Sequence, residues 1–372
     1  MKDLQSARNE LEEQVAEKKQ FFQTESYQMS IGELISLYEN KELIVSPKFQ
    51  RFFRWNQRQK SRFIESILLG IPIPQIFVYQ NEDEIWEVVD GLQRVSTLIS
   101  FIFDDQLKSV NNYNKLVLSG TSYLPGLEGV VWQNPKAKEK ELPDKLKLAI
   151  KRTKLGFSII KSESDVNAKY EVFQRLNTGG TFASAQEVRN SVMVMLNPEI
   201  YDWFEDLSNN EIFKNLTDLS ENQINARYDM ELILRFVALT KFNYDSKGDL
   251  KDYFDDVIVK ILKDPNFPTK ILTNEFSAIL TCLEKCGEDG IFRRYSKDKG
   301  FSGRFSEAAF EIIMLGLYNN LDSYRNMEDG AILLLKIQSL HEDAEYLGIS
   351  GSGSNAKSRI PKLAKLAKRI FN

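Results

Sequence analysis

The residues best suited to chemistry in this sequence are Asp90, Gln93 and Arg94, which lie together in the stretch 90–94. An apolar pair typical of a buried strand precedes them, and Gly91 provides a turn before a helical pattern. The first turn of a helix carries unpaired backbone N–H groups at its positive end and suits a phosphate. Arg94 adds a forked charged donor, and Asp90 is a candidate ligand for a divalent metal or a ribose hydroxyl. The stretch therefore predicts the centre of a nucleotide or phosphodiester site.

A purely structural interpretation of the same residues stays open. In it, the acid caps the helix and forms a salt bridge with the arginine. In the functional interpretation, Gly91 lets the backbone approach the ligand and Arg94 neutralises phosphate charge. Gln93 then orients a water or contacts a base, and Asp90 is the metal ligand or general base.

Composition limits the classes of protein that the chain can belong to. Its 372 residues are enough for two domains, and 42% hydrophobic with 27% charged residues is ordinary for a globular protein. The net charge of −4 requires any nucleic-acid surface to be a local patch. No apolar run approaches the roughly 20 residues that cross a bilayer, and the N-terminus lacks an apolar signal core. We expect a cytoplasmic protein without membrane contact.

Cysteine and histidine are too few for the common metal and hydrolase sites. Cys282 and Cys286 are four residues apart in a helical pattern, which indicates reduced thiols on one helix face rather than a zinc site. His341 is the only histidine, and this argues against enzymes that use histidine as a base. We expect His341 to be a surface or capping residue.

Apolar periodicity predicts a mixed α/β first half and a nearly all-helical second half. The first half is predicted to contain strands at 44–45, 75–79, 86–89 and 155–160. Its predicted helices are at 4–22, from a capping box at 30–33 through Tyr38, and at 57–69, 93–103, 145–152, 165–176 and 185–196. Beyond 197 the candidate helices are 199–207, 225–241, 249–262, 268–285, 306–320, 329–346 and 358–370. The polar helix at 4–22 has coiled-coil-like spacing, so it is either an arm packed on its own domain or an arm that binds a partner.

Three separated motifs resemble the family of bacterial domains that includes the N-terminal half of GmrSD-type modification-dependent restriction enzymes. The motifs are Phe49-Gln50-Arg51 with Trp55 and a helix ending at Gly70, Asp90-Gly91-Leu92-Gln93-Arg94 with Ser96 and Thr97, and 173–181 with 186–190. The resemblance covers roughly residues 28–195. Its hallmark is a DGQQR signature, which is associated with binding and hydrolysis of nucleoside triphosphates in phage-defence proteins. Leu92 departs from it, since the family usually has glutamine there.

The resemblance implies an α/β (α+β) ParB/sulfiredoxin-like N-terminal domain followed by a mostly α-helical C-terminal domain. We expect a helical arm at 1–25, the DGQQR-type domain at 26–196, and a helical domain with a basic last helix at 197–372. Relatives often carry a C-terminal HNH nuclease domain built on several histidines. A chain with one histidine is not expected to contain that domain.

The resemblance also assigns roles to single residues. Asp90, Gln93 and Arg94 are the expected catalytic residues, with Asp90 as the Mg²⁺ ligand. The expected nucleotide-binding residues are Gln50, Arg51, Gly91, Arg94, Ser96, Thr97, Arg175 and Asn177. The glycines at 179–180 suit an anion cradle or a tight turn equally well. Arg189 is as well explained by a buried ion pair as by a ligand contact.

Two basic patches are candidates for nucleic-acid contact. Arg54 and Arg58 lie in or just after a stretch dense in arginine and aromatic residues, a mixture that suits backbone contact and base stacking. The alternative is that the aromatic side chains pack in the core and the basic ones are solvated. The last helix carries Lys362, Lys365 and Arg369 beside an apolar face, so it is either a packed terminal helix or a docking helix. Residues 293–305 are expected to be a loop with a weaker patch of the same kind.

Together these features predict a protein that binds a nucleoside triphosphate with Mg²⁺ and hydrolyses it. The resemblance implies a sensor or regulator in a bacterial anti-phage or restriction system, with DNA, a separate effector protein or a second copy as partner. One alternative is a non-enzymatic switch that binds nucleotide or DNA. Another is a nuclease whose metal site uses only carboxylates.

Overall fold

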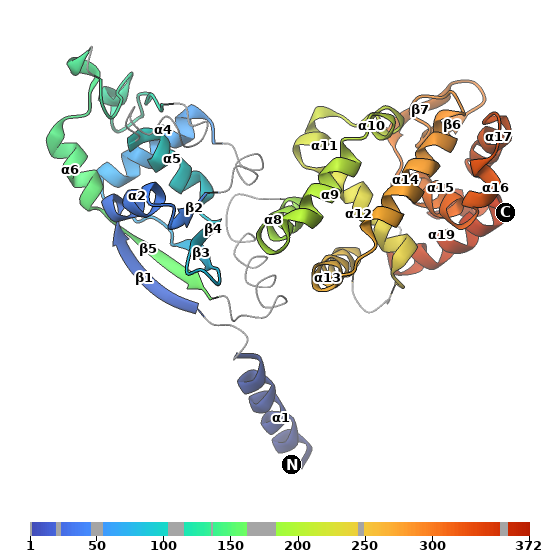
Figure 1. The fold of residues 1–372 in the computed structure, drawn as a ribbon, viewed down its shortest axis with the longest axis horizontal. Helices are drawn as coiled ribbons and strands as arrows, with labels where there is room; N and C mark the ends of the chain where they lie inside the picture. The colour runs from blue at the N-terminus through green and yellow to red at the C-terminus, as the bar shows by residue number, and fades with distance from the viewer. Residues whose placement is uncertain are drawn as a thin grey trace. The chain divides into compact units, whose positions relative to one another are not determined.

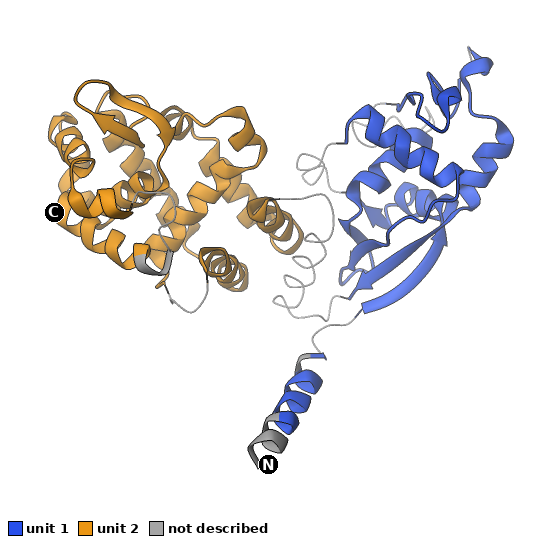
Figure 2. Ribbon diagram, turned by 180° about the vertical axis from the view of Figure 1, so that it is seen from behind, with its two compact units in different colours: residues 1–182 blue, residues 183–372 orange. Residues whose placement is uncertain are grey.

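The computed structural model describes residues 2–19, 24–45, 55–102, 115–134, 137–161, 184–244, 249–349 and 356–372. The chain forms two compact units, which are unit 1 at residues 1–182 and unit 2 at residues 183–372 (Figure 2). The mixed α/β class of the first half and the helical class of the second half are confirmed. No described helix is long and apolar enough to span a membrane.

Unit 1 is built on a mixed five-stranded sheet with the order β1-β5-β3-β4-β2. The strands are β1 Thr24–Ser30, β2 Leu43–Ile44, β3 Ile76–Gln80, β4 Trp86–Asp90 and β5 Lys154–Ile160. β1 and β5 are antiparallel, as are β3 and β4, whereas β3 runs parallel to β5 and β2 runs parallel to β4. Apolar residues such as Ile76, Val78 and Phe157 are fully buried in the centre of this sheet, which explains why it forms.

The helices of unit 1 are α1 Lys2–Lys19, α2 Ile31–Glu39, α4 Gln57–Leu68, α5 Leu92–Ile102 and α6 Asp144–Arg152, with short 3₁₀ turns at Pro125–Leu127 and Lys138–Lys140. Figure 1 shows α2, α4 and α5 together on one side of the sheet. α4 begins with a capping box between Asn56 and Gln59. On α1, Leu11 and Val15 are 60% and 57% exposed, so these positions are not packed on the domain.

Unit 2 consists of helices and one hairpin. The helices are α8 Ala185–Leu196, α9 Pro198–Ser208, α10 Glu211–Thr217, α11 Glu221–Asn225, α12 Tyr228–Lys241, α13 Leu250–Lys263, α14 Thr269–Glu284, α15 Glu307–Asn319, α16 Leu321–Arg325, α17 Ala331–Leu340, α18 Ala344–Ile349 and α19 Ala356–Phe371. The hairpin pairs β6 Arg293–Ser296 with β7 Gly300–Phe305. α12 and α15 are buried over most of their length and form the centre of the core. α19 packs on α15, where a Cβ on Gly316 would lie 2.3 Å from the Phe371 ring.

The structure corrects four predictions. β1 was not predicted, because its sequence TESYQMS is mostly polar and lacks apolar alternation. Residues 293–305 form a hairpin and not a loop, because backbone pairing holds two short, polar strands. The helix expected at 329–346 is two helices, interrupted at 341–343. Of the two alternatives predicted for His341, the capping one is confirmed, because it is the C-cap residue of α17, and the surface one is wrong, because it is 6% exposed.

Cys282 and Cys286 are both buried in unit 2. Burial raises the pKa of the Cys286 thiol to about 12, so this group stays protonated at neutral pH. Its Sγ lies 3.8 Å from the Cys282 carbonyl oxygen and 3.6 Å from that of Gly330. The pair therefore serves as small apolar packing residues.

Candidate functional site

The predicted phosphate site lies where β4 ends and α5 begins. Asp90 is the last residue of β4, Gly91 has a positive φ of 91°, and Leu92 is the first residue of α5. The Val95 amide donates to the Gly91 carbonyl at 2.9 Å, so the amides of residues 92–94 precede the first hydrogen bond of the helix. This end of the helix therefore presents a positive dipole beside a carboxylate and a guanidinium.

The Arg94 guanidinium is held by one carboxylate and two backbone carbonyls. Its Nη2 donates to Asp90 Oδ2 at 2.9 Å, and its Nη1 donates to the carbonyl oxygens of Pro74 and, at 3.1 Å, of Gln75. The side chain is 12% exposed, against 34% for Asp90. Burial lowers the pKa of Arg94, and the neighbouring Asp90 carboxylate opposes that shift, so the arginine keeps its charge at neutral pH. Three of its five N–H donors are engaged by these contacts.

Gly91 makes room for Arg94. A Cβ at this position would lie 3.0 Å from Arg94 Nη2 and 3.0 Å from Ile76 Cγ1. The guanidinium therefore occupies the space that a side chain at position 91 would need. The expected close approach of the Gly91 backbone to a ligand stays a prediction, because the observed neighbour on this side is the arginine.

Gln93 joins α5 to the start of α4. Its Oε1 accepts a hydrogen bond from the Trp55 backbone amide at 2.9 Å. The Trp55 ring packs edge-on against Phe63 of α4, with 5.5 Å between ring centroids. One lone pair of the Gln93 side-chain oxygen is thus used, and its second lone pair and the amide nitrogen are left to orient a water or contact a base.

Ser96 and Thr97 differ in how their hydroxyls are satisfied. The Thr97 Oγ1 donates to the Gln93 carbonyl at 2.6 Å and is buried. The Ser96 Oγ is buried and has no hydrogen-bond partner within the described part of the chain. A buried hydroxyl without a partner is unfavourable, so Ser96 is the better candidate of the two for a ligand contact.

The structure brings together only part of the predicted set. Gln50, Arg51, Arg54, Arg175 and Asn177 lie outside the described residues. Arg58 is exposed on α4.

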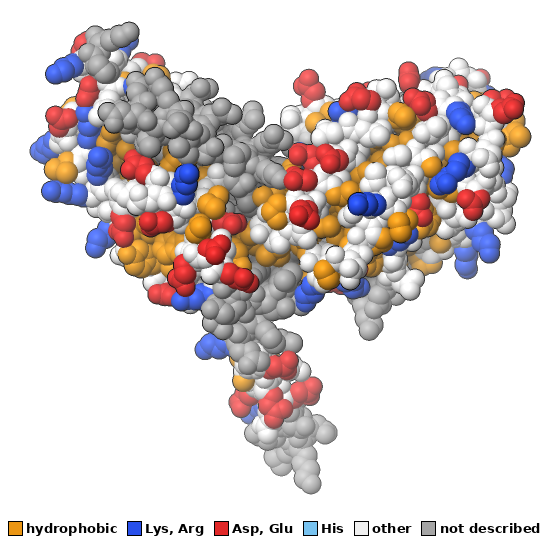
Figure 3. All heavy atoms as spheres, viewed as in Figure 1, with side chains coloured by type: hydrophobic (Ala, Val, Ile, Leu, Met, Phe, Trp, Pro, Cys, Tyr) orange, Lys and Arg blue, Asp and Glu red, His pale blue; other side chains and the backbone are white. Residues whose placement is uncertain are grey.

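The basic residues of α19 have mixed surroundings. Lys362 and Lys365 are exposed, whereas Arg369 forms ion pairs with Asp343 at 2.8 Å and Glu345 at 3.2 Å. The apolar face of this helix is packed in unit 2, where Leu363 and Leu366 are fully buried. On the face shown in Figure 3, acidic and basic side chains are interspersed. Contact of these residues with DNA stays a prediction.

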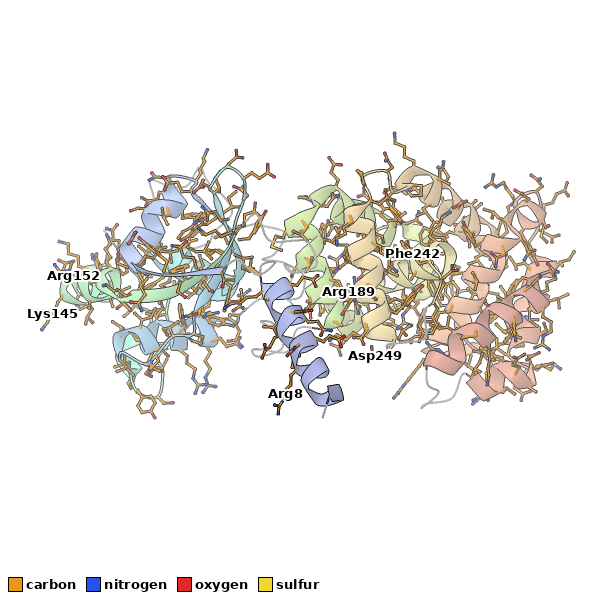
Figure 4. All side chains as sticks on the ribbon, turned by 90° about the horizontal axis from the view of Figure 1, so that it is seen from below. Arg8, Lys145, Arg152, Arg189, Phe242 and Asp249 are labelled. Atoms are coloured by element: carbon orange, nitrogen blue, oxygen red, sulfur yellow. The ribbon has the colours of Figure 1, made fainter. Side chains whose placement is uncertain are left out.

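Arg189 of the third motif is a buried structural residue. It is 1% exposed, lies among the helices of unit 2 (Figure 4), and its Nε donates to Asp255 Oδ1 at 2.7 Å. Neighbouring Ser184 and Glu187 form the capping box of α8, and Gln186 donates to Asn190 at 2.8 Å. The ion-pair interpretation of Arg189 is therefore confirmed.

Asp90 fits Mg²⁺ only together with a phosphate ligand. No group of three or more His, Cys, Asp or Glu side chains suited to a metal occurs within the ranges that the structure describes. Mg²⁺ is commonly held by one or two carboxylates plus substrate phosphates and water. One carboxylate at the end of β4 meets that pattern, but its Oδ2 is already shared with Arg94.

Three contacts of this site were not visible in the sequence. They are the carbonyls of Pro74 and Gln75 and the amide of Trp55. The sequence hinted at the two carbonyls only through the prolines after α4, because prolines interrupt regular secondary structure and leave nearby carbonyls without backbone hydrogen bonds. A cavity of about 220 Å³ in unit 1 lies at the other end of α5, next to Ile99 and Ile102, and none of the predicted site residues lines it.

Comparison with protein-family models gives a match to part of the chain. Residues 31–194 match the family described as GmrSD restriction endonuclease, N-terminal domain. No curated protein matches the chain. The matched range contains β2 to β5 and also α8, which belongs to unit 2.

Proposed function

We propose that this chain is a restriction-system protein and that its domain at residues 31–194, which matches the GmrSD N-terminal family, binds and hydrolyses a nucleoside triphosphate. The observation that supports the proposal best is the Asp90–Arg94 pair at the N-terminus of α5. A helix N-terminus and a guanidinium both favour phosphate oxygens, and the β4–Gly91–α5 turn presents them together.

Ligand binding in this proposal is an exchange of partners. A phosphate oxygen replaces Asp90 Oδ2 on Arg94 Nη2, and the two carbonyls keep the guanidinium in position through Nη1. The Asp90 carboxylate is then free to hold Mg²⁺ or a water near the phosphates. Mg²⁺ bound there would neutralise developing charge on the phosphate oxygens. The amides of residues 92–94 stabilise the same charge from the helix end.

The decisive experiment compares two conservative variants with a matched ion pair elsewhere in unit 1. Asp90→Asn and Arg94→Lys should weaken nucleotide affinity at least about tenfold, or about 1.4 kcal/mol, because asparagine lacks the carboxylate charge for the metal and lysine lacks the forked guanidinium that the Pro74 and Gln75 carbonyls hold in position. Affinity is measured by calorimetry and turnover by phosphate release, with Mg²⁺ present.

The matched control is Lys147→Met. Lys147 is 14% exposed and pairs with Glu141 and, at 3.1 Å, with Asp144, so the burial of this pair resembles that at Arg94. Its loss should leave nucleotide affinity and turnover unchanged. Wild-type affinity in both site variants, with folding intact by circular dichroism, would refute the site.

A non-enzymatic switch is the second candidate, and one contact favours it. Asp90 Oδ2 already accepts a hydrogen bond from Arg94, so this oxygen can take a proton from water only after that contact is broken. Saturable nucleotide binding without phosphate release above background would select the switch. The carboxylate-metal nuclease is tested by Mg²⁺- or Mn²⁺-dependent cutting of modified and unmodified DNA, and loss of cutting in Asp90→Asn would assign it to this site.

The role of sensor or regulator beside a separate effector is part of the proposal. It is supported by the restriction-system family of residues 31–194. Co-purification of an effector protein from cells, dependent on nucleotide, is the measurement that tests it.

A further inference from the structure

A second polar cavity lies in unit 2, and none of the residues of the proposed nucleotide site lines it. Its volume is about 580 Å³, within the range of small-molecule sites. The β6–β7 hairpin contributes Arg294 and Arg304 to its wall, and α19 contributes Arg359. The start of α15 and the α17–α18 connection complete the wall. Five separate elements thus converge on one hollow.

His341 lines this cavity and is the observation that points to a ligand. The side chain is 6% exposed, and neither ring nitrogen has a hydrogen-bond partner among the residues described. Its ring packs edge-on against Tyr346, with 5.0 Å between centroids, and against Phe301 at 6.0 Å. A buried polar group without a partner destabilises the protein by roughly 1–3 kcal/mol, so a bound group that satisfies the imidazole would recover that energy.

Two arginines of the wall are free to bind a ligand. Arg294 and Arg304 are exposed, and the described part of the chain offers them no ion pair or hydrogen bond. Arg359 is engaged, since its Nη2 lies 3.2 Å from Glu311 and 3.9 Å from Glu307. The hairpin therefore supplies two uncompensated positive charges to one side of the cavity.

One carboxylate, that of Glu307, belongs to the cavity wall, and both it and the neighbouring Glu311 are already paired with Arg235. Arg235 bonds Glu311 at 2.6 Å and Glu307 at 3.1 Å, and the Tyr228 hydroxyl donates to Glu307 at 2.8 Å. These contacts keep the carboxylates from pairing with Arg294 or Arg304. The positive end of the 13-residue helix α15, capped by Ser306, faces the same hollow.

We infer that this cavity binds the phosphate group of a small ligand, with Arg294 and Arg304 as charged donors and His341 as a neutral donor. Several donors from different directions suit a tetrahedral oxyanion better than a planar carboxylate, which a single arginine fork already satisfies. The rings of Phe305 and Tyr346 add an apolar wall for the remainder of the ligand. The site is independent of the one at Arg94, so either can fail without the other.

The single histidine gives a clean test on the full chain. The imidazole resonances in an NMR spectrum report only His341. Inorganic phosphate, pyrophosphate and AMP are titrated at constant ionic strength, with acetate and chloride as the comparison anions. The inference requires saturable shifts with the phosphorylated probes and none with acetate or chloride. Equal shifts with all anions, or none with any, would overturn it.

Variants then assign the contacts. Arg294→Gln and Arg304→Gln should each weaken binding of the phosphorylated probes about tenfold, as expected for loss of a charged hydrogen bond. Lys299→Gln is the matched control, because it removes one charge from the same hairpin outside the cavity wall and should change affinity less than twofold. If all three variants weaken binding equally, the effect comes from the loss of one positive charge at long range, and the proposed site is overturned.

Two further experiments complete the test. The first asks whether this site is distinct from the one at Arg94, and the second asks whether its ligand is a small molecule or a nucleic acid. The titration repeated in Arg94→Lys should give the same His341 shifts, whatever that variant does to hydrolysis. A short single-stranded oligonucleotide that shifts His341 when AMP and pyrophosphate do not would overturn the small-ligand assignment.

Discussion

Arg94 in unit 1 and Arg235 in unit 2 both pair with carboxylates, but their surroundings differ. Arg94 has one carboxylate, that of Asp90, whose side chain is 34% exposed. Arg235 is 5% exposed and lies within 2.6–3.1 Å of Glu231, Glu307 and Glu311, over the Phe254 ring at 5.2 Å. Burial works against the charge of Arg235, but the carboxylates outweigh it and raise its pKa. An arginine shared by three carboxylates, one of which (Glu311) is 1% exposed, is fixed, whereas an arginine paired with a single carboxylate that is 34% exposed can exchange it for a ligand.

The largest effect is expected when Arg235, the arginine held by three carboxylates, is replaced. Arg235→Met leaves Glu311, which is 1% exposed, with only Arg359 as counter-charge. We expect a loss of about 3–5 kcal/mol in the free energy of unfolding, because an uncompensated buried charge is left behind. Urea unfolding is measured together with hydrogen exchange in α12 and α15. A variant as stable as the wild type would show that the network adds no net stability.

The pH dependence of stability tests the buried imidazole of unit 2. Burial first, and then the charge of Arg294, lower the pKa of His341 to about 4, below its value of 6.5 in the unfolded chain. The unfolded state therefore binds the proton first, and the stability that is complete above pH 6.5 is lost as the pH falls towards 4. The wild type should lose up to about 3 kcal/mol over this window relative to His341→Phe.

The measurement is the difference between the two unfolding curves, because carboxylates titrate in both proteins. His341→Phe keeps the ring contacts with Tyr346 and Phe301 and removes both nitrogens. Parallel pH profiles would show that His341 is accessible to protons in the folded state.

The smallest expected effect is that of an added methyl group beside Arg94, tested by comparing two glycine variants. Gly91→Ala and Gly70→Ala both place a side chain at positive φ, 91° and 70°, which costs about 1–2 kcal/mol each. At Gly70 nothing lies within 4 Å of the new Cβ, whereas at Gly91 the Arg94 guanidinium lies at 3.0 Å. Both variants should lose similar stability by thermal unfolding, and only Gly91→Ala should weaken nucleotide binding. Equal nucleotide affinities in the two variants would show that Gly91 is not part of the binding site.

Local pattern predicted most of the elements in the described part of the chain, and the role of the β4–α5 turn as a ligand site stays a prediction. α5 followed from its apolar periodicity after a glycine, and the four-residue spacing of Asp90 and Arg94 predicted their ion pair. β1 and the β6–β7 hairpin did not follow, because their residues are polar and their order comes from pairing with distant segments. The carbonyls on Arg94 and the burial of His341 also depend on contacts distant in sequence.

The place of α8 has a practical consequence for anyone who separates the two halves of this protein. The family match ends at residue 194, yet α8 packs against α9, α12 and α13, with Val192 and Met193 fully buried. In a fragment that ends at residue 196, α8 would expose apolar side chains that unit 2 normally buries. The remaining fragment would expose the apolar surfaces of α9, α12 and α13 that α8 covers. If the chain is divided before Ser184, we expect both fragments to stay in solution. If it is divided after residue 196, we expect the fragments to precipitate.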